Sequence, residues 1–111
     1  MTVRLPTHLE VAGWRRAVEA GGGFAAILAK GDPDVGSVLL LTIERGGNPR
    51  LWERMPQRDG SRIFTPIGVQ SIDNKQDFSE YLARRRAQDP DLWIVELDVP
   101  KPERFVDLRS G

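Results

Sequence analysis

The sequence predicts an α+β fold: a mostly antiparallel sheet of five or six strands with two helices packed on one face, in the order α-β-β-β-β-α-β. The first observation is that two segments, 8–20 and 74–88, carry apolar residues at helical spacing behind a capping-box pattern. The second is that short runs rich in branched and aromatic residues alternate with clusters of glycine, proline and aspartate, which form turns. The length of 111 residues fits one domain, 1–111, whose last segment, 100–111, is expected to be a partly ordered tail or an edge strand.

The first helix is predicted from His8 to Ala20. Thr7 and Glu10 have the spacing of a capping box, in which the hydroxyl and the carboxylate satisfy free amides at the helix start. One face carries the apolar residues Val11, Trp14, Ala17 and Val18, and the other face carries Arg15, Arg16 and Glu19. Gly21–Gly23 ends the helix, and a phosphate-binding loop would need the opposite order, strand before helix.

Five strands are predicted from the pattern of apolar runs and turns: Phe24–Lys30, Ser37–Arg45, Arg50–Met55, Arg62–Thr65 and Leu92–Val99. Short connections between the first four favour an antiparallel meander, because parallel strands need long crossovers. The strand Ser37–Arg45 is apolar on both faces, which predicts a central position. Its far face is expected to be covered by the tail or by a partner chain.

The second helix is predicted from Asn74 to Gln88, after a capping-box spacing at Asp73–Gln76. Phe78, Tyr81 and Leu82 form its apolar stripe. The turn Asp89-Pro90-Asp91 ends it, since proline disfavours a helical residue before it.

The composition excludes several classes of protein. The chain has no cysteine and one histidine, so disulfides are excluded and no metal site or cofactor is predicted. Sixteen basic residues balance sixteen acidic ones, which makes nucleic-acid binding unlikely, because phosphate neutralisation needs excess positive charge. No apolar stretch approaches the roughly 20 residues that span a bilayer, and no signal-peptide pattern is present. We therefore expect a cytoplasmic protein without a membrane partner.

Three stretches of the chain resemble a known family. They are Gly22–Leu28 with Lys30–Gly36, Phe78–Arg86, and Asp89–Glu96. On these stretches the chain is similar to the uncharacterised bacterial proteins of domain of unknown function 1491, which are typical of alphaproteobacteria. The resemblance covers nearly the whole chain and implies a stand-alone bacterial domain. It implies no activity, cofactor or site residue.

One candidate site for a small anionic ligand or nucleotide lies at the end of the second helix. Arg85 falls on the apolar stripe of that helix, where an arginine needs a partner. It is expected to extend from the helix end to water, to pair with Asp89 four residues on, or to bind an anion beside Asp89 and Asp91. The aspartates on either side of Pro90, like those on either side of Pro33, favour turns. If the two loops meet, four carboxylates cluster.

The second candidate surface is the basic hairpin, residues 45–62. Trp52 and Arg54 share one face of the third strand, and Arg50 and Arg62 lie nearby. Tryptophan and arginine are the side chains that most often anchor protein interfaces. The alternative is that Trp52 belongs to the core and the arginines are solvated.

No pattern for a catalytic nucleophile or a phosphate loop is present, and no catalytic residue is predicted. The leading hypothesis is a non-enzymatic protein-interaction module that uses the basic hairpin to bind a protein partner or a second copy. The alternative is a binder of a small anionic ligand or nucleotide. A small enzyme that uses scattered carboxylates ranks behind both, and it would need an acid with a raised pKa in a cleft.

Overall fold

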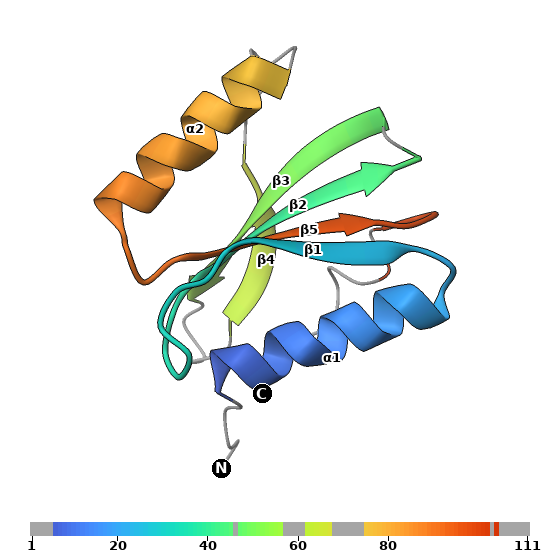
Figure 1. The fold of residues 1–111 in the computed structure, drawn as a ribbon, viewed down its shortest axis with the longest axis horizontal. Helices are drawn as coiled ribbons and strands as arrows, with labels where there is room; N and C mark the ends of the chain where they lie inside the picture. The colour runs from blue at the N-terminus through green and yellow to red at the C-terminus, as the bar shows by residue number, and fades with distance from the viewer. Residues whose placement is uncertain (1–5, 46, 57–61, 68–74, 103, 105–111) are drawn as a thin grey trace.

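The computed structural model describes residues 6–45, 47–56, 62–67, 75–102 and 104. The elements, in chain order, are α1 (Thr7–Ala20), β1 (Phe24–Ala29), β2 (Val38–Glu44), β3 (Gly47–Pro56), β4 (Arg62–Pro66), α2 (Lys75–Gln88) and β5 (Trp93–Asp98). Figure 1 shows the two helices and the sheet between them. The predicted element order is confirmed, and β3 begins at Gly47, before the predicted Arg50. Residues 73 and 74, with which the second predicted capping box begins, and the tail from 105 onward lie outside the described residues.

The five strands form one sheet in the order β1-β5-β2-β3-β4. The pairs β1–β5, β2–β3 and β3–β4 are antiparallel, and β2–β5 is parallel, so the prediction of a mostly antiparallel sheet is confirmed. The prediction that the first four strands form an antiparallel meander is wrong for β1 and β2, because β5 lies between these two strands. The crossover through α2 is long enough for parallel pairing. Trp93, Ile94 and Val95 of β5 are all buried, which agrees with its central position.

The two helices cover opposite faces of the sheet, which corrects the expectation that both pack on one face (Figure 1). Apolar residues of α1 pack with Val38 and Leu40, whereas Tyr81 and Leu82 of α2 pack against the cluster that contains Leu39. Successive strand residues point to opposite faces, so the continuous apolar run of β2 requires a cover on both sides. For β2 the second cover is α2.

The N-terminus of α1 is held by a distant loop, and the predicted capping box does not form. The N–H groups of Thr7 and His8 donate to the carbonyls of Asp34 and Pro33, at 3.2 and 2.9 Å. The Thr7 hydroxyl donates to the Gly36 carbonyl at 2.9 Å and makes no cap hydrogen bond within the helix. The loop carbonyls satisfy the first amides, so the side chains of the predicted box have other partners.

Two of the stretches that resemble the family meet in space. The Asp32 N–H donates to the Asp91 carbonyl at 3.0 Å, and the indole N–H of Trp93 donates to the Asp32 carbonyl at 2.7 Å. A Cβ atom on Gly31 would lie 1.9 Å from the Asp91 carbonyl oxygen. Only glycine permits this approach of two backbones. The loop 31–36 therefore joins α1 to the start of β5.

Candidate functional site

Trp52 and Arg50 of the basic hairpin differ in exposure. Trp52 is half-buried against the core on the α1 face, and its indole N–H donates to the Thr42 hydroxyl at 2.9 Å. Arg50 is exposed near the start of β3. The side chain of Arg62 lies outside the described residues. The part of Trp52 that packs inward matches the alternative expectation, in which this residue belongs to the core.

Arg54 lies inside the protein, not on its surface. Its Nη1 donates to both carboxylate oxygens of Glu10, each at 3.0 Å. The guanidinium carbon lies 5.4 Å from the centre of the Trp14 ring and 5.2 Å from that of Phe64. The expectation of an exposed anchor is therefore corrected: α1 brings a carboxylate and an aromatic ring over this face of β3, and Arg54 is buried between them.

Arg85 finds its partner on β3 instead of in the loop after its own helix. It donates to the Tyr81 hydroxyl at 3.2 Å and forms an ion pair with Glu53. Burial lowers the pKa of Arg85, but the bonds to Tyr81 and Glu53 outweigh burial and raise that pKa above its ordinary value. Of the alternatives left open by the sequence, internal pairing applies, with Glu53 in place of Asp89.

Asp89 and Asp91 belong to a turn. The Asp89 carboxylate accepts the N–H of Asp91 at 3.1 Å. Asp32 is used in the same way: its carboxylate accepts the N–H groups of Val35 and Asp34, each at 2.9 Å, and these bonds lower its pKa. Although the two loops touch, the described residues contain no group of three or more acidic or histidine side chains suited to a metal ion.

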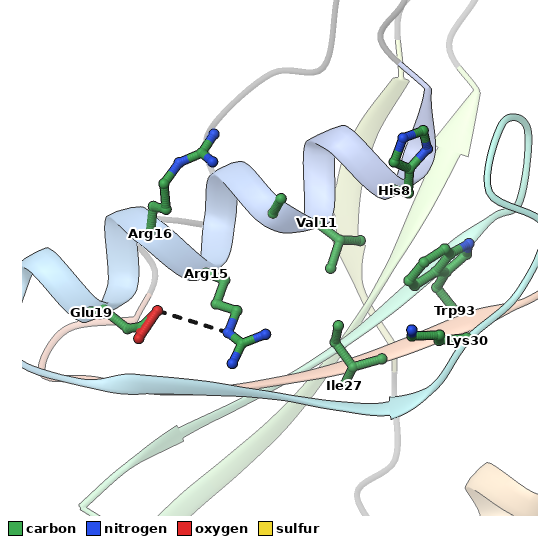
Figure 2. Close-up of a pocket in the computed structure, with 9 residues that line it drawn as sticks. His8, Val11, Arg15, Arg16, Glu19, Ile27, Lys30 and Trp93 are labelled. Atoms are coloured by element: carbon green, nitrogen blue, oxygen red, sulfur yellow. Dashed lines mark ion pairs between the residues drawn. The ribbon is translucent and has the colours of Figure 1, made fainter.

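The structure reveals a groove between α1 and β1, with a volume of about 400 Å³. Figure 2 shows its walls. The residues that line it are His8, Val11, Ala12, Arg15, Arg16, Glu19, Ile27, Lys30 and Trp93. The base is apolar and the rim carries charge, mostly positive.

Charged residues lie on both sides of Ile27 in this groove. In Figure 2, Arg15 lies on one side and Lys30 on the other, while Arg16 points away from β1. Arg15 and Glu19 form an exposed ion pair at 3.8 Å. At the far end, Nδ1 of His8 lies 2.9 Å from the Pro33 carbonyl; because that oxygen only accepts, Nδ1 carries the hydrogen.

The strand beside this groove, β1, is an edge of the sheet. The N–H groups of Trp93 and Val99 donate to carbonyls of Ser37 and Ile43, so the odd-numbered residues of β5 direct their backbone groups toward β2. The even-numbered residues then bond β1, through their partners Phe24 and Ala26. It follows that the backbone N–H and C=O groups at the intervening residues, Ala25 and Ile27, point away from the sheet.

Two large apolar side chains are exposed on β1. Phe24 is 60% exposed and Leu28 is 47% exposed. The strand contains no charged residue and no proline, which are the usual protections of a sheet edge. A bulge between Ile27 and Ala29 interrupts the pairing at one end only.

Neither β1 nor the groove was predicted as a site. The sequence interpretation placed β1 next to β2, and it placed Arg15 on the solvent face of its helix. The uncharged run Phe24–Ala29 was the one sequence feature that could have indicated this surface. The sequence does not show that this run forms an edge strand, because that depends on β5 lying between β1 and β2. Neither described helix is long and apolar enough to cross a membrane.

Comparisons with known proteins agree with the resemblance seen in the sequence. The family model described as "Protein of unknown function (DUF1491)" matches residues 5–107. The NMR structure of a DUF1491 family protein from Caulobacter crescentus CB15 is 31% identical, with 95% of this chain and 94% of that chain covered and a TM-score of 0.79. The crystal structure of a DUF1491 family protein from the same organism is 32% identical, with coverage of 91% and 94% and a TM-score of 0.77. A solution structure from A. tumefaciens is 28% identical, with coverage of 96% and 95% and a TM-score of 0.76. No curated protein matches.

Proposed function

Because the chain belongs to the DUF1491 family, whose description assigns no activity, we propose a function from its own surface: a non-enzymatic protein-interaction module that binds an extended segment of a partner protein along β1. The observation that carries the proposal is an uncharged strand with two exposed apolar side chains, at an edge of the sheet that no other described strand pairs with. A partner strand that pairs with such an edge gains main-chain hydrogen bonds, and alternate side chains supply specificity.

The geometry of β1 supports strand addition. The outward N–H and C=O groups of Ala25 and Ile27 form the ladder positions that a new strand requires. Phe24 and Leu28 would pack against side chains of the added strand, and their burial would contribute favourable free energy. The regular stretch before the bulge is long enough for several ladder bonds.

Two arginines that the sequence offered as binding residues have partners inside the fold, and this favours β1 over the basic hairpin as the interaction surface. Arg54 and Arg85 are engaged by Glu10 and Glu53 within the fold, so their charges are already compensated. Binding of a small anion by Arg85 with Asp89 and Asp91 stays a prediction. The cytoplasmic location and the lack of a cofactor also stay predictions.

The proposal is tested with an array of eight-residue peptides of high β propensity, probed with the purified protein. Ala25→Pro removes an outward N–H without breaking a β1–β5 bond, so we expect it to abolish binding and leave the thermal unfolding midpoint nearly unchanged. Leu28→Ala should weaken binding. Leu9→Ala is the matched control, because Leu9 is also 47% exposed but lies on α1.

Two results would contradict the proposal. One is peptide binding that survives both Ala25→Pro and Leu28→Ala. The other is a homodimer in sedimentation experiments that is lost in Ala25→Pro, which would assign the edge to a second copy of the chain instead of a partner protein.

A further inference from the structure

The groove between α1 and β1 runs beside the open edge of β1. On α1 its lining extends from His8 to Glu19, which corresponds to about 16 Å at about 1.5 Å per helical residue. An extended strand of five residues covers roughly the same length, at about 3.3 Å per residue. A strand added to β1 would therefore lie alongside the groove for most of its length.

The register of β1 determines which side chains of an added strand face the groove. Residues directly opposite each other in a pair of strands direct their side chains to the same face. Ala25 and Ile27 pack toward the α1 face, so the residues opposite them would point toward the groove. The residues between would lie on the other face, where Phe24 is exposed.

The charge of the groove selects the side chains that can face it. Arg15 and Lys30 lie on either side of Ile27 (Figure 2). The acidic group on this rim, Glu19, forms an exposed ion pair with Arg15 at 3.8 Å, and such a pair is weak. A carboxylate that arrives with a partner strand can therefore compete with Glu19 for Arg15.

From these observations we infer that the partner segment is acidic on one face and apolar on the other, with carboxylates at alternate residues. The carboxylates contact Arg15 and Lys30 in the groove, and the intervening apolar side chains pack on the face that exposes Phe24. This inference rests on the proposed function, because it requires strand addition to β1. The rim cations are exposed and the groove base, at Ile27 and Trp93, is apolar, which suits an amphipathic strand better than an isolated phosphate.

The test uses a fluorescein-labelled peptide of sequence Gly-Glu-Val-Glu-Val-Glu-Gly, with analogues that carry Gln or Lys in place of every Glu. Fluorescence anisotropy is measured with the full chain at low and moderate salt. We expect the Glu peptide to bind at least about tenfold more tightly than the Gln peptide, and the difference to shrink with salt. The Lys peptide should bind most weakly.

Matched variants assign the effect to the groove. Arg15→Gln and Lys30→Gln should each weaken binding of the Glu peptide by about threefold and leave binding of the Gln peptide unchanged. Glu19→Gln should strengthen binding of the Glu peptide, because it removes the carboxylate that competes for Arg15. Arg84→Gln, which neutralises an exposed arginine of α2, is the control and should change neither.

The outcomes separate this inference from the proposed function. Equal binding of the Glu and Gln peptides, lost in Ala25→Pro, would overturn the acidic partner and keep strand addition. Binding of no peptide would overturn both. Tight binding of the Glu peptide that Ala25→Pro does not reduce, or its displacement by millimolar inorganic phosphate, would show a simple anion site. Binding that requires deletion of residues 105–111 would assign the edge to the chain's own C-terminal segment.

Discussion

Glu53 and Arg54 are neighbours on β3, and each forms an ion pair with the helix on its own face of the sheet. Arg54 pairs with Glu10 of α1, and the two side chains are only 1% and 6% exposed. Glu53 pairs with Arg85 of α2, and these side chains are each 26% exposed. Both pairs join an arginine to a glutamate, and they differ most in burial.

The difference shows how one strand positions two helices with unequal strength. In the buried pair neither charge has access to water, so each depends on its partner. The guanidinium of Arg54 also lies against the rings of Trp14 and Phe64. In the partly exposed pair of Glu53 and Arg85, water can replace a lost partner. We therefore expect α1 to be the more strongly specified of the two helix positions.

The largest loss of stability is expected from Glu10→Gln, which leaves the buried charge of Arg54 without a counter-ion. The free energy of unfolding should fall by about 3–5 kcal/mol. Urea denaturation followed by tryptophan fluorescence measures the change. A loss below about 1 kcal/mol would show that Arg54 is compensated in another way.

The double variant Glu10→Leu/Arg54→Met sharpens this test, because it removes both buried charges and keeps apolar volume. Its stability should exceed that of Glu10→Gln, since no unpaired charge remains. A double variant less stable than the single one would mean that the rings of Trp14 and Phe64 need the guanidinium itself.

A smaller effect is expected from Glu53→Gln. Because this pair is partly hydrated, the free energy of unfolding should fall by about 1 kcal/mol, and the difference from the wild type should shrink in 1 M salt. Loss of stability as large as that of Glu10→Gln, with no salt dependence, would contradict the assigned difference in burial. The control is Glu96→Gln on β5, a half-buried carboxylate of the same sheet.

The smallest loss of stability is expected at Asp32, whose carboxylate accepts backbone hydrogen bonds in a turn. Backbone N–H groups of Val35 and Asp34 lower its pKa below the ordinary 3.8 in the folded state. Its contribution is therefore fully present above the unfolded-state pKa and is lost as the pH falls through the folded-state pKa. Asp32→Asn should be slightly less stable than wild type at pH 7, and the two should converge below pH 3.8. A gap that persists in acid would rule out the carboxylate charge as its cause.

None of the proposed site could be predicted from the sequence, but the need of one arginine for a partner could. The apolar stripe of the second helix indicated that Arg85 needs a partner, and Arg85 is indeed paired. That the partner is Glu53 could not be predicted, because 32 residues separate the two in the chain. Likewise, Thr7 and Glu10 match a capping box by spacing, but a loop 27 residues away and a strand residue 44 residues away are their actual partners.

The sequence by itself determined the order and the approximate limits of the helices and strands, because helical spacing, strand alternation and turn residues act over a few neighbouring positions. Only the tertiary structure decided that β5 lies between β1 and β2, that the helices cover opposite faces, and that β1 is left at an edge beside a charged groove. These features depend on which apolar faces bury each other, and that choice is made among segments far apart in the chain. The proposed interaction surface belongs to this second group.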